Sequence, residues 1–518
     1  MIKPSNINNH RIVFFILFLG FISYGQDLKV KINKNISYQT IEGFGASDAW
    51  RFQFVGKNWP IKKKEKIAEW LFSKKVDKKG TPKGIGLSIW RFYLGAGTTE
   101  QGKNSNIKNE WRRSESFLSP NGKYDWNKQE GQQWFLKKAK KYGVDKFIAF
   151  SISAPVQWTK NGKGYNGNNK DGEINLKANH FDDFAQFMVN FLKHFKSKGI
   201  AFDYLSPINE PQWDWEKKSQ EGTPATNKNI IKIAKLLNDK IEHNNLSTKI
   251  VLGESADLRW LYSDFGKPKR GSQIDYFFNQ QNKIKNVKNT ISGHSYFTTW
   301  PIDSLISIRQ KLNDKIKSKN LNYWQSEFCI LENNSDIGGG HNRDLGMNTA
   351  LYVARVIHAD LTLANASSWQ WWTALTNANY KDGLIYLDTG DKNDLYNLNH
   401  LKSDGYFHDS KLLWAFGNFS RFIRPKMKRV KIETNQHKSV KETYKDIMIS
   451  AYLDKKTSKL VVVVINHSNK NRVIDFSDYQ IVSIYETSKN KNLEHRSITN
   501  KRINFKARSV NTLIGSVL

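Results

Sequence analysis

The spacing of hydrophobic and polar residues changes along this chain, and the changes divide it into parts. From residue 43, short apolar runs alternate with longer stretches in which apolar residues recur every three or four positions. Short apolar runs are typical of strands buried on both faces, and the longer period predicts amphipathic helices. From about residue 427 the helical period disappears, and short alternating segments predict strands joined by polar turns.

The middle part repeats one unit, a buried strand followed by a helix. Strands are expected at 43–46, 86–94, 146–154, 204–208, 249–253, 290–296, 322–328 and 366–373. Helices are expected at 62–73, 128–142, 180–198, 227–243, 272–283, 302–317, 344–364 and 409–421. Eight such units are typical of a (β/α)8 TIM barrel. A doubly wound open sheet is the competing fold, but no glycine-rich phosphate loop follows the first strand.

The strands near the C-terminus predict a second, smaller domain. We expect the barrel to span residues 27–424 and a side-associated β-sandwich to span 425–518, with the boundary near Pro425. Residues 28–40 begin with an alternating pattern that places lysines outward, which is typical of an edge strand. We assign this strand to the side β-domain.

The N-terminus has the pattern of a secretory signal peptide. Lys3 and Arg11 precede an apolar run at 12–22, which is short for a membrane span. We therefore expect residues 1–26 to be removed and the mature chain to be periplasmic or secreted, without a membrane span. The single cysteine, Cys329, excludes an internal disulfide.

The formal net charge is +33, which raises the question of an anionic partner. The lysines are spread along the whole chain, and no compact basic stripe accompanies them. We therefore favour compositional bias over nucleic-acid binding and expect no nucleic-acid partner. We also expect a monomer.

Two glutamates stand where barrel enzymes keep their catalytic groups. Glu210 lies in the sequence Asn-Glu-Pro just after the strand at 204–208, and Glu327 lies at the end of the strand at 322–328. Asn-Glu-Pro alone is also an ordinary turn sequence. An unpaired buried carboxylate costs several kcal/mol, so Glu327 calls for a function or a partner. The alternative for Glu327 is a structural ion pair with Arg91. Two carboxyl groups in one cleft are the arrangement of a glycosidase.

The motifs resemble glycoside hydrolase family 30 of clan A, whose members are retaining enzymes with a (β/α)8 barrel and a side β-sandwich. The residues that carry the resemblance are GFGAS at 43–47, GLSIWRF at 86–92, SPINEP at 206–211, GHSY at 293–296, WQSEF at 324–328 and GNFSRFIRP at 417–425. The resemblance implies that Glu210 is the acid/base and Glu327 the nucleophile.

Further roles are implied by the same resemblance. Asn209 is expected to bind the sugar 2-hydroxyl, and Arg91 to hold Glu327 ionised. Tyr296 is expected to donate to Glu327. His294 is expected to bind sugar or a carboxylate, with a buried core histidine as the alternative.

Several tryptophans are candidates for sugar stacking. Trp158 follows the third strand, where the family walls its site with two prolines before the aromatic, whereas this chain has one. Alternate residues of the last strand face opposite ways, so only some of its tryptophans can contact sugar, and we select Trp369 and Trp371. Cys329 is expected to be a buried apolar residue. No metal or cofactor is expected.

The motifs are most similar to the secreted endo-β-1,6-galactanase branch of the family. The expected substrate is thus a plant- or algal-type polysaccharide, namely arabinogalactan side chains. The same mechanism on β-1,6-glucan or xylan is an alternative. A non-catalytic carbohydrate-binding protein is the alternative from another class, although it has no need of the two glutamates.

Overall fold

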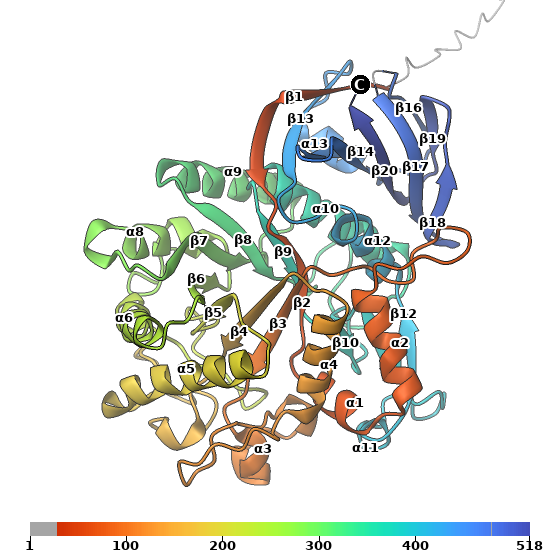
Figure 1. The fold of residues 1–518 in the computed structure, drawn as a ribbon. Helices are drawn as coiled ribbons and strands as arrows, with labels where there is room; N and C mark the ends of the chain where they lie inside the picture. Colours follow the sequence, from red (N-terminus) through yellow and green to blue (C-terminus); the bar gives the residue numbers. More distant parts are fainter. Residues whose placement is uncertain (1–27, 478, 518) are drawn as a thin grey trace, which may run out of the picture.

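The computed structural model describes residues 28–477 and 479–517, and a closed barrel of eight parallel strands lies at its centre (Figure 1). The predicted signal peptide at 1–26 lies outside the described residues. β2 pairs with both β3 and β9, which closes the barrel. Its strands are β2 (Gly43–Ser47), β3 (Ile89–Leu94), β4 (Lys146–Ser151), β5 (Tyr204–Ser206), β6 (Lys249–Ser255), β7 (Val287–His294), β8 (Asn322–Glu327) and β9 (Ser368–Trp371).

Every predicted barrel strand is therefore present, and the (β/α)8 prediction is confirmed. The runs are apolar on both faces because one face fills the barrel and the other packs against helices; β3 is buried at all its positions. Gly45 of β2 has a specific packing reason. A Cβ there would lie 2.8 Å from the Cβ of Ile89, so only glycine lets β2 approach β3 this closely.

The helices surround the barrel, and most lie where the periodicity predicts them. They are α1 (Phe52–Asn58), α2 (Ile61–Phe72), α3 (Thr98–Gln101), α4 (Glu130–Lys141), α5 (Phe181–Ser197), α6 (Asn227–His243), α7 (Arg259–Tyr262), α8 (Gln273–Phe277), α9 (Ile302–Ser318), α10 (Met347–Thr362), α11 (Leu398–Leu401) and α12 (Lys411–Ser420). The helix predicted at 272–283 was too long. It ends at Phe277 because the Asn279 side chain caps a separate 3-10 turn by accepting from the Asn282 amide.

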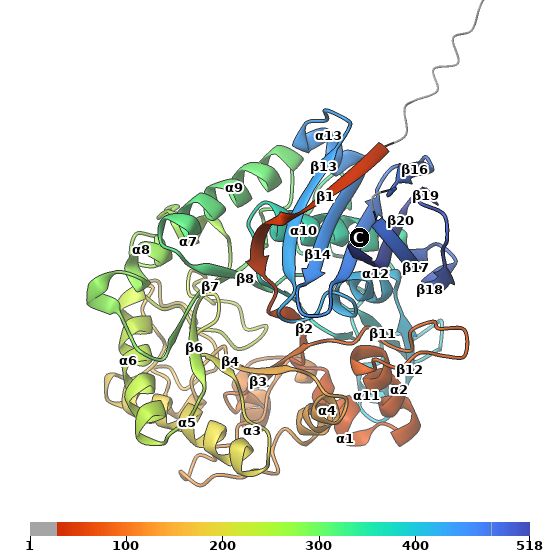
Figure 2. The same ribbon diagram turned by 45° about the horizontal axis from the view of Figure 1, so that its top comes forward.

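The second domain is a nine-stranded sheet beside the barrel (Figure 2). β1 (Leu28–Thr40) lies within this sheet, antiparallel to β13 and parallel to β16. The other strands are β13 (Lys428–Thr434), β14 (Ile447–Asp454), β15 (Lys459–Asn466), β16 (Arg472–Asp475), β17 (Tyr479–Ser488), β18 (Lys491–Ser497), β19 (Arg502–Phe505) and β20 (Ser509–Val517). Residues from both ends of the sheet, such as Ile474 and Leu513, share one apolar core. The helix α13 (Val440–Lys445) lies between β13 and β14.

Two further features complete the fold. A small sheet of β10 (Leu375–Thr376), β11 (Ile385–Asp388) and β12 (Tyr406–Asp409) follows β9. α12 is buried from Leu412 to Ser420 because it packs on both the barrel and the β-domain, and Asn418 donates to the carbonyl of Tyr485 in β17. Within residues 28–477 and 479–517, none of the helices combines the length and the hydropathy needed to span a bilayer.

Candidate active site

Six of the nine predicted functional residues converge at the carboxyl ends of the barrel strands. Parallel strands bring the side chains at these ends into one mouth, where barrel enzymes carry out their chemistry. Seven side chains, which we call the carboxylate cluster, contact one another there: Arg91, Asn209, Glu210, Glu254, His294, Tyr296 and Glu327. Each is at most 7% exposed.

Glu327 is held by two donors. Arg91 Nη1 lies 2.5 Å from Oε2 of Glu327, and Tyr296 Oη donates to Oε1 over 3.1 Å. The guanidinium of Arg91 also lies 3.7 Å from the ring centre of Phe150, which fixes its plane. A carboxylate that two hydrogen bonds hold at this position is suited to attack an electrophile.

Glu210 has a different environment. Its Oε1 lies 2.8 Å from Nδ1 of His294. Burial raises the pKa of Glu210, and the hydrogen bond and charge of His294 oppose that rise only in part. Its backbone φ is +47°, a strained conformation that costs about 1–3 kcal/mol and is concentrated at functional sites. Glu210 is therefore suited to carrying a proton.

Glu254 is a third buried carboxylate, which was not predicted from the sequence. It accepts from Arg91 Nη2 over 3.1 Å and from Ser326 Oγ over 2.8 Å, and it contacts His294 Nε2 at 2.9 Å. Burial alone would raise the pKa of Glu254, but Arg91 and His294 outweigh it and lower the pKa to about 2. The sequence signal was the same as for Glu327, a lone glutamate ending an apolar strand.

His294 links two of these carboxylates through its two ring nitrogens. Burial lowers the pKa of His294, but the charge of Glu327 and the hydrogen bonds to Glu210 and Glu254 outweigh it and raise the pKa to about 10. The imidazole is therefore cationic at neutral pH. The cluster then holds three carboxylates against Arg91 and His294, so a single proton on Glu210 balances its charge.

Carboxylate oxygens of Glu210 and Glu327 and a ring nitrogen of His294 all lie within 4.8 Å of one another. Such a set could hold a metal ion in principle. A protonated His294 whose two nitrogens both face carboxylates has no lone pair to offer, and Arg91 already occupies Glu327. The donor chemistry thus favours a hydrogen-bonded carboxyl pair over a metal centre.

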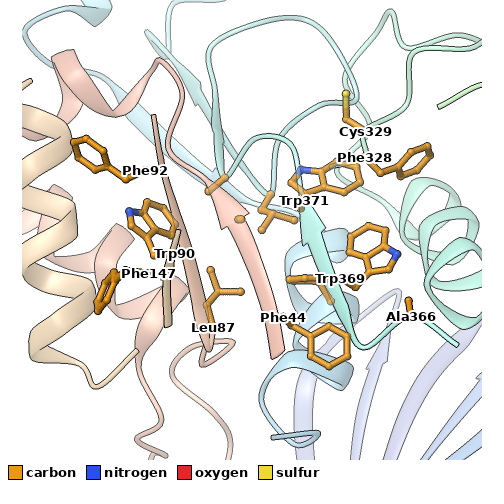
Figure 3. Packing of buried hydrophobic residues seen from close by; sticks show 14 of the residues in the cluster. Phe44, Leu87, Trp90, Phe92, Phe147, Phe328, Cys329, Ala366, Trp369 and Trp371 are labelled. Carbon is orange, nitrogen blue, oxygen red and sulfur yellow. The ribbon is translucent and has the colours of Figure 1, made fainter. Parts of the chain in front are cut away.

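The selection of Trp369 and Trp371 as sugar-contacting residues was wrong. They are 0% and 1% exposed, and Figure 3 shows them among the buried apolar side chains. Their face of β9 points away from the barrel axis, where Trp369 Nε1 donates to Asp360 over 2.8 Å. The next residue, Trp372, is half-buried and packs against Trp50 and Phe150 in the mouth.

Trp158 packs against α5 and the turn before it. Its ring stacks on His180 with 5.7 Å between centroids and meets Phe187 of α5 edge-on. Its packing against the side of α5 explains its partial burial. Cys329 is buried, as expected, and its sulfur lies 3.9 Å from Tyr296 Oη.

Comparison with known proteins agrees with this geometry. The family described as O-glycosyl hydrolase family 30 matches residues 27–386. An endo-β-1,6-galactanase of Hypocrea rufa is 24% identical over 391 residues, which cover 71% of each chain. A conserved exported protein from Bacteroides fragilis is 38% identical with a TM-score of 0.88, covering 94% of this chain and 100% of that one.

A more distant structure shares the fold. The catalytic domain of a family 30 xylanase C from Talaromyces cellulolyticus aligns with a TM-score of 0.66 at 21% identity, over 94% of this chain and 100% of that one. The family match covers well over half of the sequence, and the barrel mouth holds the carboxyl pair that this chemistry needs. The chain therefore belongs to glycoside hydrolase family 30 and is an O-glycoside hydrolase.

Proposed function

We propose that the protein cleaves β-linked polysaccharide by double displacement, with Glu327 as the nucleophile and Glu210 as the acid/base. The observation that carries this proposal is the approach of their carboxylate oxygens to within 4.8 Å. Retaining glycosidases hold their carboxyl groups about 5–5.5 Å apart, whereas inverting enzymes need about 6.5–9.5 Å to admit water between them. The separation here supports direct attack by a carboxylate.

In the first step, an oxygen of Glu327 attacks the anomeric carbon while protonated Glu210 donates to the departing glycosidic oxygen. Arg91 and Tyr296 hold the Glu327 carboxylate in position for this attack through their hydrogen bonds. Arg91 Nη2 also donates to Asn209 Oδ1 over 2.9 Å. Because the oxygen of the Asn209 amide faces Arg91, its nitrogen faces away from Arg91 and can donate to the sugar 2-hydroxyl.

In the second step, water attacks the glycosyl ester of Glu327. Glu210, now ionised, removes a proton from that water and so returns to its starting state. His294 stabilises the ionised form of Glu210 through the 2.8 Å contact and therefore supports the switch from acid to base.

Azide rescue assigns the two roles. In Glu327→Gly, azide should enter the space left by the nucleophile and give an α-glycosyl azide from an activated β-glycoside. In Glu210→Ala, azide should instead attack the glycosyl-enzyme and give the β-glycosyl azide. The same azide product from both variants would contradict the assignment.

The proposed substrate is the β-1,6-galactan side chain of arabinogalactan. The similarity to the Hypocrea rufa endo-β-1,6-galactanase supports this choice. The test is mass spectrometry and proton NMR of products from debranched arabinogalactan, β-1,6-glucan and glucuronoxylan, beside Glu327→Gln. Galacto-oligomers released by the parent chain alone would support the proposal. Oligomers released from glucan or xylan, with the galactan left intact, would show that the substrate is one of those polymers and would leave the proposed mechanism unchanged.

We further propose that the chain is exported after removal of residues 1–26. The N-terminal pattern of basic and apolar residues supports this, as does the similarity to an exported Bacteroides fragilis protein. N-terminal sequencing of the protein from culture should find a chain that begins at Asp27. An intact Met1 on the active enzyme would contradict export by this route.

A further inference from the structure

A second polar cluster lies beside the carboxylate cluster, where the loops after β2 and β9 meet. Arg51 is 3% exposed, and its Nη2 lies 3.3 Å from Oδ2 of Asp382. Arg112 is half-buried, and its Nη1 donates to Gln220 over 3.0 Å. Both guanidinium carbons lie close to the Trp50 ring, at 5.7 Å and 5.5 Å from its centre. We call Trp50, Arg51, Arg112, Asn377 and Asp382 the arginine cluster.

Side-chain contacts join the arginine cluster to the catalytic groups without a break. Arg91, which holds Glu327, lies over the ring of Phe150. The rings of Phe150 and Trp372 are 6.3 Å apart, and those of Trp372 and Trp50 are 5.2 Å apart. A glycan bound at Glu327 therefore lies near both arginines, because only the contacting rings of Phe150, Trp372 and Trp50 lie between Arg91 and the arginine cluster.

The arginine cluster contains buried polar atoms whose bonding is incomplete. Within residues 28–477 and 479–517, Arg51 Nη1, Asn377 Nδ2 and Asp382 Oδ1 have no hydrogen-bond partner. Each such atom costs about 1–3 kcal/mol if it stays unsatisfied. Since native structures leave few such groups unpaired, three of them together indicate a place that a polar ligand fills.

The charge of the arginine cluster indicates which kind of polar ligand it binds. Among the residues that the structure describes, Asp382 is the only carboxylate that pairs with Arg51, and Arg112 is bonded to a neutral amide. Burial and the nearby charge of Arg51 both lower the pKa of Arg112, as expected for two cations with too little counter-charge. Neutral sugar hydroxyls could satisfy the free donors, but they would leave this excess positive charge uncompensated. The planar fork of a guanidinium is suited to an oxyanion with two oxygens.

We propose that the arginine cluster is a subsite for a sugar residue that carries an anionic group, either a uronate carboxylate or a sulfate ester. As a substrate subsite it rests on the proposed glycosidase function, but the binding chemistry stands on the arginines themselves. Arg51 forms its buried floor with Asp382 and Asn377, and Arg112 supplies the second charge at its half-buried edge.

Ligand-observed NMR titration of the full chain in a Glu327→Gln background tests the subsite without turnover. The probes are methyl β-glucuronide, methyl β-glucoside and methyl β-glucoside 6-sulfate. An anionic probe should bind roughly tenfold or more tightly than the neutral glycoside, as a charge-assisted bond predicts. Preference for the glucuronide or for the sulfate identifies the anionic group. Equal affinity for all three probes, or no binding of any, would overturn the proposal.

Arg112→Gln is the decisive variant because Arg112 is only half-buried and the chain offers a matched control. It should abolish the preference for the anionic probe and leave the neutral affinity unchanged. Arg113→Gln removes the neighbouring arginine, which donates to the Ile107 carbonyl, and should leave the preference intact. An equal loss for both probes in Arg112→Gln would indicate a structural role only. If the parent chain degrades no glycan yet retains Arg112-dependent binding, the proposed function fails and the subsite stands.

Discussion

Replacing Glu254 by glutamine should destabilise the fold by an amount that the structure sets. The side chain keeps its shape, but the buried cluster loses one negative charge facing Arg91 and His294. In the folded protein the pKa of Glu254 is lowered from 4.5 to about 2. At 1.36 kcal/mol per pKa unit, this shift corresponds to about 3 kcal/mol of stability at neutral pH. A loss of that size also matches the cost of removing one partner from a buried ion pair.

The stability difference between the parent chain and Glu254→Gln should decrease as the pH falls. Because the folded pKa lies below the unfolded one, the stabilisation is complete above pH 4.5 and is lost as pH falls from 4.5 towards 2. Urea denaturation should therefore show Glu254→Gln about 3 kcal/mol less stable than the parent chain at pH 7, and the gap should narrow by about 1.4 kcal/mol at pH 3.5. The control is Glu242→Gln, an exposed partner of Lys285, which should cost at most about 1 kcal/mol. Equal stability of Glu254→Gln and the parent chain at pH 7 would mean that the Glu254 charge does not stabilise the folded protein.

Two further predictions concern the pH profile and the tryptophans. In kcat/KM, activity should fall as pH rises through the pKa of Glu210, and His294→Gln should move this limb to higher pH, because the imidazolium lowers the pKa of Glu210; an unmoved or lowered limb would contradict this. Trp369→Ala should cost about 3–5 kcal/mol in the free energy of unfolding, since the ring is fully buried. Trp372→Ala should raise KM severalfold with a smaller loss of stability. A raised KM in Trp369→Ala with an unchanged KM in Trp372→Ala would instead indicate that Trp369 contacts the sugar.

The barrel could be predicted from the sequence because short, largely buried strand segments alternate with long helical stretches eight times. The positions of Glu327 and Glu210 in the barrel mouth could be predicted because a charge at the end of such a run is conspicuous. Glu254 was missed because the exact end of a strand is hard to place from sequence. The predicted strand stopped at Gly253, one residue short of Glu254, whereas β6 continues to Ser255.

The tryptophans of β9 could not be assigned from the sequence. Alternation shows that Trp369 and Trp371 share a face, but a strand buried on both faces gives no sign of which face points into the mouth. The closure of the barrel decides it, through pairing of β9 with both β2 and β8. The arginine cluster was likewise invisible, since Arg51 and Asp382 are 331 residues apart and meet only in the folded chain.

The anomeric configuration of the first product distinguishes double displacement through Glu327 from a single displacement by water. Proton NMR should follow the cleavage of β-1,6-linked galacto-oligosaccharides by the parent chain from the first minute, before mutarotation equilibrates the anomers. Two displacements, the first by Glu327, predict that the β anomer forms first and that the α anomer grows only later. The α anomer forming first would show a single displacement by water and would contradict the role of Glu327 as nucleophile.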